Sequence, residues 1–106
     1  MGHEDDADLR ISAQRALLGH VVPSLRAVSL DIIPLQHRIL IRFVFDAQPH
    51  DSVRDVVGCA ATEIIADYPD GWEISEEIVI CPAPMEIDDL RLRAYRRCED
   101  AWVTGR

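Results

Sequence analysis

The histidines and cysteines of this sequence could ligate a metal ion, and the cysteines could form disulfides. No histidine stands at a ligand spacing such as His-x₃-His from another histidine or from a cysteine. The cysteines are odd in number and far apart, in apolar or helical stretches, so we interpret them as buried free thiols. The sequence therefore predicts no metal site and no disulfide framework. These residues are His3, His20, His37, His50, Cys59, Cys81 and Cys98.

Adjacent carboxylates are a second possible source of chemistry. The pairs Glu76-Glu77 and Asp88-Asp89 would point to opposite sides of an extended chain, which is unsuited to a shared acid–base task. None of the glycine-rich phosphate loops or nucleophile motifs is present. A cysteine–histidine pair assembled by the fold stays open, but buried thiols explain the cysteines more simply. We therefore expect no catalytic residues, no cofactor and no enzyme.

Acidic residues dominate the middle of the chain. The sequence has 106 residues, a net charge of -8, and an apolar fraction of 48%, which is enough for one folded domain. Residues 46–89 hold twelve acidic side chains against one arginine, a formal charge of -11, whereas residues 9–45 carry +4 and residues 90–106 carry +3. This balance argues against direct binding to nucleic acid or to an anionic membrane. It leaves open a basic protein partner.

The acidic segment has two interpretations. It could be a solvated surface, with its repulsion relieved if the arginine-rich end lies beside it. It could instead steer a positively charged partner. Asp67 favours this second interpretation, because a carboxylate near a helix C-terminus is opposed by the helix dipole and needs another reason to be there. Trp72 either covers the open end of the core or anchors that partner. If this segment forms a partner-binding face, the residues predicted to contact the partner are Asp55, Glu63, Asp67, Asp70, Trp72, Glu73 and Glu77.

Periodic apolar residues predict the elements that would position this face. Helical spacing and strict alternation place helices at 8–20 and 51–68, and strands at 24–33, 37–46, 72–80 and 90–97. A helix over 88–103 is the competing interpretation of the last strand. The predicted fold is an α+β two-layer sandwich in the order α-β-β-α-β-β, with a mainly antiparallel four-stranded sheet and helices packed on it. Residues 1–8 form a flexible acidic tail, and residues 9–106 a single domain.

Local details of these elements can also be predicted. Asp8 or Ser12 would cap the first helix, and Asp51 or Ser52 the second. In the first strand, Arg26 would share the inward face with its apolar neighbours. Strict alternation would bury Glu76, so we expect a bulge at Glu76-Glu77.

Five short segments carry a family resemblance. They are Arg15–Gly19, Pro23–Val28, Arg42–Asp46, Thr62–Pro69 and Glu76–Ile78. Together they resemble small bacterial immunity proteins of contact-dependent growth inhibition and related polymorphic toxin systems, over roughly residues 11–81. The acidic N-terminus and the arginine-rich end lie outside the resemblance.

The resemblance implies a toxin inhibitor without a catalytic motif. Such a protein binds its cognate toxin domain one-to-one in the cytoplasm, and the toxin is frequently a nuclease with a basic groove. A cytoplasmic location also agrees with an acidic N-terminus that has no signal-peptide pattern, and with the lack of any apolar run long enough for a membrane span. The alternative function is a non-catalytic regulatory or scaffolding module that binds another basic protein.

Overall fold

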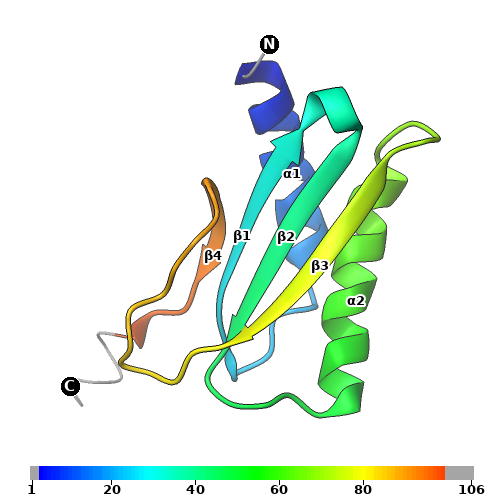
Figure 1. The fold of residues 1–106 in the computed structure, drawn as a ribbon. Helices are drawn as coiled ribbons and strands as arrows, with labels where there is room; N and C mark the ends of the chain where they lie inside the picture. The colour runs from blue at the N-terminus through cyan, green and yellow to red at the C-terminus, as the bar shows by residue number, and fades with distance from the viewer. Residues whose placement is uncertain (1–2, 100–106) are drawn as a thin grey trace.

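The computed structural model describes residues 3–99, which form a four-stranded sheet with two helices on one face (Figure 1). The elements are α1 (His3–Leu17), β1 (Leu25–Ile33), the short 3₁₀ helix η1 (Pro34–Gln36), β2 (Arg38–Phe45), α2 (Asp51–Ala66), β3 (Glu73–Ile80) and β4 (Leu92–Arg96). The α+β class is confirmed, and the order of elements differs from the predicted one by the addition of η1. Strand β4 confirms the strand interpretation of this segment, whereas residues 100–103 lie outside the described part.

The sheet is mixed, so the prediction of a mainly antiparallel sheet is wrong. Its strand order is β3-β2-β1-β4; β1 pairs antiparallel with β2 and β4, and β2 pairs parallel with β3. The parallel pair follows from α2, which returns the chain along the sheet before β3 begins, as a crossover between parallel neighbours requires. Strands β3 and β4 consequently form opposite edges, so the arginines of β4 do not lie beside β3.

The core lies between the sheet and the two helices. Alternate residues of β2 turn toward the helices and are buried, as their alternation predicts. The helices contribute small and aliphatic side chains that pack on this face. The buried residues of these three elements include Leu9, Ala13, Ala16 and Leu17 of α1, Ile39, Ile41, Phe43 and Phe45 of β2, and Val57, Ala60, Ala61 and Ile64 of α2.

Strand β1 departs from strict alternation near its start. Its register with β2 shifts between Leu25 and Ala27, which makes Arg26 an extra residue on β1. Leu25 joins the core with Val28 and Leu30, so Arg26 does not share the inward face predicted for it. The bulge leaves the Arg26 side chain outside the apolar core and free to reach neighbouring segments.

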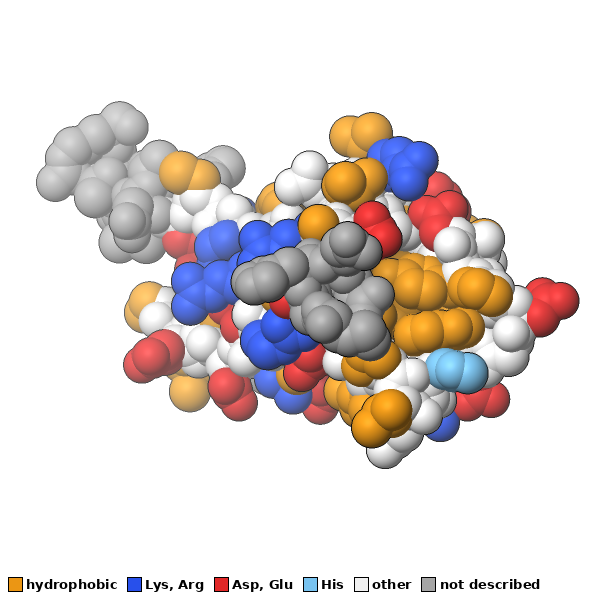
Figure 2. Space-filling view, turned by 90° about the horizontal axis from the view of Figure 1, so that it is seen from above, with side chains coloured by type: hydrophobic (Ala, Val, Ile, Leu, Met, Phe, Trp, Pro, Cys, Tyr) orange, Lys and Arg blue, Asp and Glu red, His pale blue; other side chains and the backbone are white. Residues whose placement is uncertain are grey.

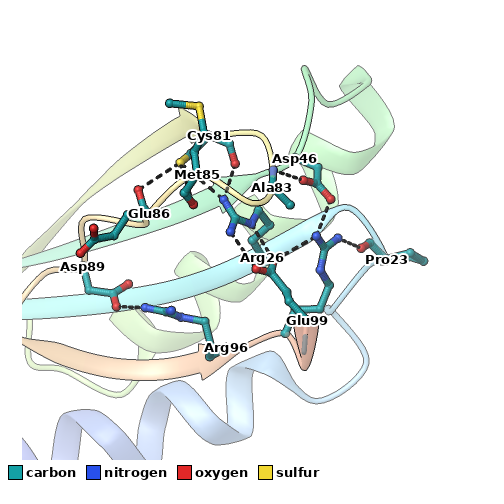
Figure 3. Close-up of polar contacts among 11 residues, drawn as sticks. Pro23, Arg26, Asp46, Cys81, Ala83, Met85, Glu86, Asp89, Arg96 and Glu99 are labelled. Carbon is teal, nitrogen blue, oxygen red and sulfur yellow. Dashed lines mark hydrogen bonds and ion pairs between the residues drawn. The ribbon is translucent and has the colours of Figure 1, made fainter. Parts of the chain in front are cut away.

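Arg26 is the centre of a buried ion-pair network (Figure 3). Its side chain is only 3% exposed, and its Nε and Nη2 atoms donate to the two carboxylate oxygens of Glu99 at 2.6 and 2.7 Å. Nη1 donates to the Cys81 carbonyl oxygen at 2.6 Å. Arg97 bridges Glu99 and Asp46. The network therefore joins β1 to the residues that follow β2, β3 and β4.

Both carboxylates of this network are held in the charged form. The hydrogen bond from Arg26 lowers the pKa of Glu99, and the hydrogen bond from the Ala83 amide lowers the pKa of Asp46. A lowered pKa means that the folded state binds protons less readily than the unfolded chain. These groups therefore contribute stability above the ordinary carboxyl pKa of about 4, and the contribution is lost as the pH falls through the lowered values.

The predicted helix caps are wrong. Helix α1 begins at His3, and residues 3–8, expected in a flexible tail, are helical. Ser12 is buried within α1 rather than capping it. His50 is the N-cap of α2, without a side-chain capping bond, and Asp51 is the first helical residue, where a carboxylate meets the positive end of the helix dipole.

The cysteines are more exposed than predicted. Cys59 and Cys98 are exposed, Cys81 is half-buried, and all three are free thiols. Cys59 lies on α2 immediately before the buried Ala60, so the apolar stretch around it does not mean that it faces the core. The prediction of buried thiols is therefore wrong.

Candidate partner-binding surface

Helix α2 and the edge strand β3 border an open hollow of about 700 Å³. Asp55 and Glu63 lie about two turns apart on α2 and both reach this hollow, so the structure brings together two of the predicted binding residues. The lining consists of Arg54, Asp55, Gly58, Cys59, Thr62, Glu63 and Glu76. We call these residues the α2–β3 groove.

Glu76 is a third acidic residue of the groove and is absent from the predicted set. Strand β3 pairs with β2 without any shift, so the predicted bulge is wrong. Glu76 therefore shares the helix-facing side with Ile74 and Ile78, yet it is exposed because β3 is an edge strand. The facing residue of α2 is Gly58, where a Cβ would lie 3.9 Å from Glu76 Oε1. The alternation of apolar residues along β3 is the sequence signal that places Glu76 on the same side as Ile74 and Ile78.

The acidic groups of the groove have few partners. Within residues 3–99, neither Asp55 nor Glu76 has a hydrogen-bond or ion-pair partner. Glu63 Oε2 lies 3.5 Å from Nε2 of His20, a contact that is ionic only when the histidine is protonated. Arg54 also lines the groove. The surface thus combines three carboxylates with a single guanidinium group, an arrangement that attracts cations.

Asp67 belongs to a different environment, facing α1. Its Oδ2 atom accepts a hydrogen bond of 2.6 Å from Ser12 Oγ and lies 3.7 Å from Arg15 Nη2. These groups offset the unfavourable position of a carboxylate at the end of α2. The dipole argument for a binding role of Asp67 therefore does not hold.

Glu73 and Glu77 lie on the opposite face of the sheet from the groove. The parallel register places Arg38 beside Glu73 and Arg42 beside Glu77. Arg38 Nη2 donates to Glu73 at 3.0 Å, and Arg42 Nε donates to Glu77 at 2.7 Å. The acidic repulsion of β3 is thus relieved by arginines of β2, and the predicted single acidic face is divided by the sheet.

Trp72 lies at the end of the sheet where β3 begins. It is half-buried against the core, stacks on His37 and packs at a tilt against Tyr68, with 5.1 Å between ring centroids in each pair. Asp70 is exposed in the preceding turn. Figure 2 looks down on this end and shows apolar side chains next to a histidine, with arginines on the other side of the view. These contacts favour the interpretation that Trp72 covers the core.

Residues 3–99 contain neither a cluster of metal ligands nor a helix that could span a membrane. Between residues 3 and 99, no group of three or more histidine, cysteine and acidic side chains is arranged to hold a metal ion. His20, His37 and His50 lie at separate places, after α1, after η1 and before α2. In this same part of the chain, neither helix has the length and apolar character needed to span a membrane.

A small α+β domain with a charged groove is an architecture suited to binding another protein, and the comparison of the sequence with family models defines its class as an immunity protein. The matching model is that of the MafI2 immunity protein, over residues 6–99, so the chain belongs to this family. Its predicted membership among the immunity proteins of polymorphic toxin systems is confirmed. The matched range includes β4, which lies beyond the five short segments that carry the resemblance. A comparison with curated proteins gave no match.

Proposed function

We propose that this immunity protein binds and neutralises its cognate toxin domain through the α2–β3 groove. The observation that carries the proposal is the convergence of Asp55, Glu63 and Glu76 on one open surface. Charged groups that remain exposed and unpaired keep their field for an approaching partner. Asp70 and Trp72, near the start of β3, would lie at the rim of this interface.

The proposed partner is a nuclease toxin bound one-to-one in the cytoplasm. A nuclease has to attract a polyanion, so its substrate groove is basic. An acidic surface can occupy or flank such a groove in place of the phosphate backbone. A specific interface buries about 800 Å² on each partner, which is compatible with a domain of this size. Neutralisation would require no catalytic group in the immunity protein.

The proposal is tested by co-expression with the product of the gene immediately upstream, as the candidate toxin. We expect cells that produce both chains to grow and cells that produce the toxin domain alone to stop growing. An inactive toxin variant should co-purify with the immunity protein in a one-to-one complex, measured by light scattering. Growth arrest despite co-expression, together with no complex, would contradict the proposal, and a toxin without nuclease activity would contradict its finer part.

A further inference from the structure

Strand β3 is a long edge strand with an unpaired side. It pairs with β2 from Glu73 to Ile80 without a break, and β2 is its only neighbour in the described sheet. The Glu73 amide donates to the carbonyl oxygen of His37, the residue before β2, and the Cys81 amide donates to the carbonyl oxygen of Phe45, the last residue of β2. In a parallel strand, every second residue directs its N–H and C=O groups to the same neighbour, and the residues between them direct theirs the other way. Glu73, Ser75, Glu77 and Val79 therefore face β2. Ile74, Glu76, Ile78 and Ile80 therefore direct theirs toward solvent.

The unpaired side of β3 runs along the α2–β3 groove. Figure 1 shows β3 at the edge of the sheet with α2 next to it. An edge strand beside a helix is the arrangement in which some domains receive an extended peptide, which adds a strand to the sheet while its alternate side chains contact the helix. Here the side chains on the helix side would meet Asp55, Glu63 and Glu76.

We infer that the toxin domain inserts an extended basic segment here, pairing its backbone with the outer edge of β3. The inference rests on the proposed function and specifies how the partner is held. Side chains of an extended strand alternate, so arginine or lysine at every second position would lie against the carboxylates of the groove. The backbone bonds would supply affinity, and the charges would select the segment.

A second copy of this chain is a poorer occupant of the edge. Two antiparallel β3 strands would bring Glu76 and Glu77, in the middle of the strand, close to the same acidic pair of the other copy, and facing like charges destabilise a strand pair. The opposite edge is shorter, and its arginines are engaged: Arg93 and Arg96 both bind Asp89. The charges of the edge thus discourage self-association and favour a basic strand.

Amide hydrogen exchange read residue by residue by NMR tests this inference on the free protein and on its complex with an inactive toxin domain. We expect the outward amides of Ile74, Glu76 and Ile78 to exchange rapidly in the free protein and about tenfold or more slowly in the complex. The inward amides of Ser75 and Glu77 should be protected in both. A complex that forms without new protection along β3 would overturn the inference and leave the proposed function standing.

The variant Glu76→Pro gives an independent test. Proline at this position removes an outward N–H and blocks strand addition, while the bonds from β3 to β2 remain. The matched control, Glu76→Ala, removes the carboxylate and keeps the amide. We expect Glu76→Pro to weaken toxin binding by about tenfold more than Glu76→Ala, at similar thermal stability. Equal binding by the two variants, or β3 protection in the free protein that rises with its concentration, would contradict insertion of a toxin strand.

Discussion

Replacing Glu99 by alanine is expected to lower the free energy of unfolding by about 3 kcal/mol, the lower end of the range for breaking a buried ion pair. The variant leaves the Arg26 guanidinium buried, at 3% exposure, with the Cys81 carbonyl oxygen in place of a carboxylate. The lower end applies because Glu99 itself is 20% exposed. Urea denaturation of the two proteins measures the difference.

Two further variants show whether the loss comes from the buried charge. Glu86→Ala removes an exposed carboxylate and should change stability by less than about 0.5 kcal/mol. Arg26→Met combined with Glu99→Ala should recover part of the loss, because no unpaired charge remains in the interior. If Glu99→Ala unfolds at the same urea concentration as Glu86→Ala, the network does not stabilise the fold.

The loss of stability in Glu99→Ala is also expected to depend on pH. The pKa of Glu99 is lowered in the folded protein, so its contribution is complete above its ordinary pKa of about 4 and is lost as the pH falls through the lowered value. The difference in stability between the wild type and Glu99→Ala should therefore narrow in acid. A difference that stays constant from neutral pH into this range would exclude the ionised carboxylate as its cause.

Reversing the charge of Asp55 and Glu63 together, by substitution with lysine, is expected to slow association with the toxin domain by about 10- to 100-fold at low salt. Both side chains are exposed on α2, and their field would steer a basic partner. The association rate of the variant should also depend less on salt than that of the wild type. Stopped-flow or surface-binding kinetics at several salt concentrations measure both effects.

The matched control reverses Glu86 and Asp88, which lie on the segment between β3 and β4. It changes the net charge by the same amount, away from the groove, and should leave the association rate close to that of the wild type. Equal slowing by the two double variants would assign the effect to net charge rather than to the groove. Unchanged kinetics in both would contradict the acidic binding surface.

Much of the fold could be predicted because it depends on local periodicity. The alternation from Ile39 to Phe45 and the apolar stripe of α2 mark the faces that the structure buries. The pairing of β3 could not be found in this way, because alternation defines the faces of a strand and leaves its neighbour undetermined. The helix between β2 and β3 was the available signal for a parallel pair.

The arrangement of the acidic residues was predicted less well than the fold, for a related reason. Charge counted along the sequence groups Glu63 with Glu77, whereas the sheet separates them and pairs Glu77 with Arg42. Asp55 and Glu63 lie about two turns apart on α2, and both border the groove. The position of Glu76 in the groove could not be predicted, because its exposure depends on the edge position of β3 and on Gly58 of α2, which are both tertiary features.

The pairing of β1 with β4 has a consequence for synthesis of the protein. Strand β1 occupies the middle of the sheet, but one of its sides is completed only by β4, and Arg26 depends on Glu99. The ribosome adds about 5–20 residues per second, so several seconds pass between the synthesis of β1 and the synthesis of β4. Chains stalled before residue 92 are therefore expected to be cut by protease more rapidly than the chain that includes residues 92–99.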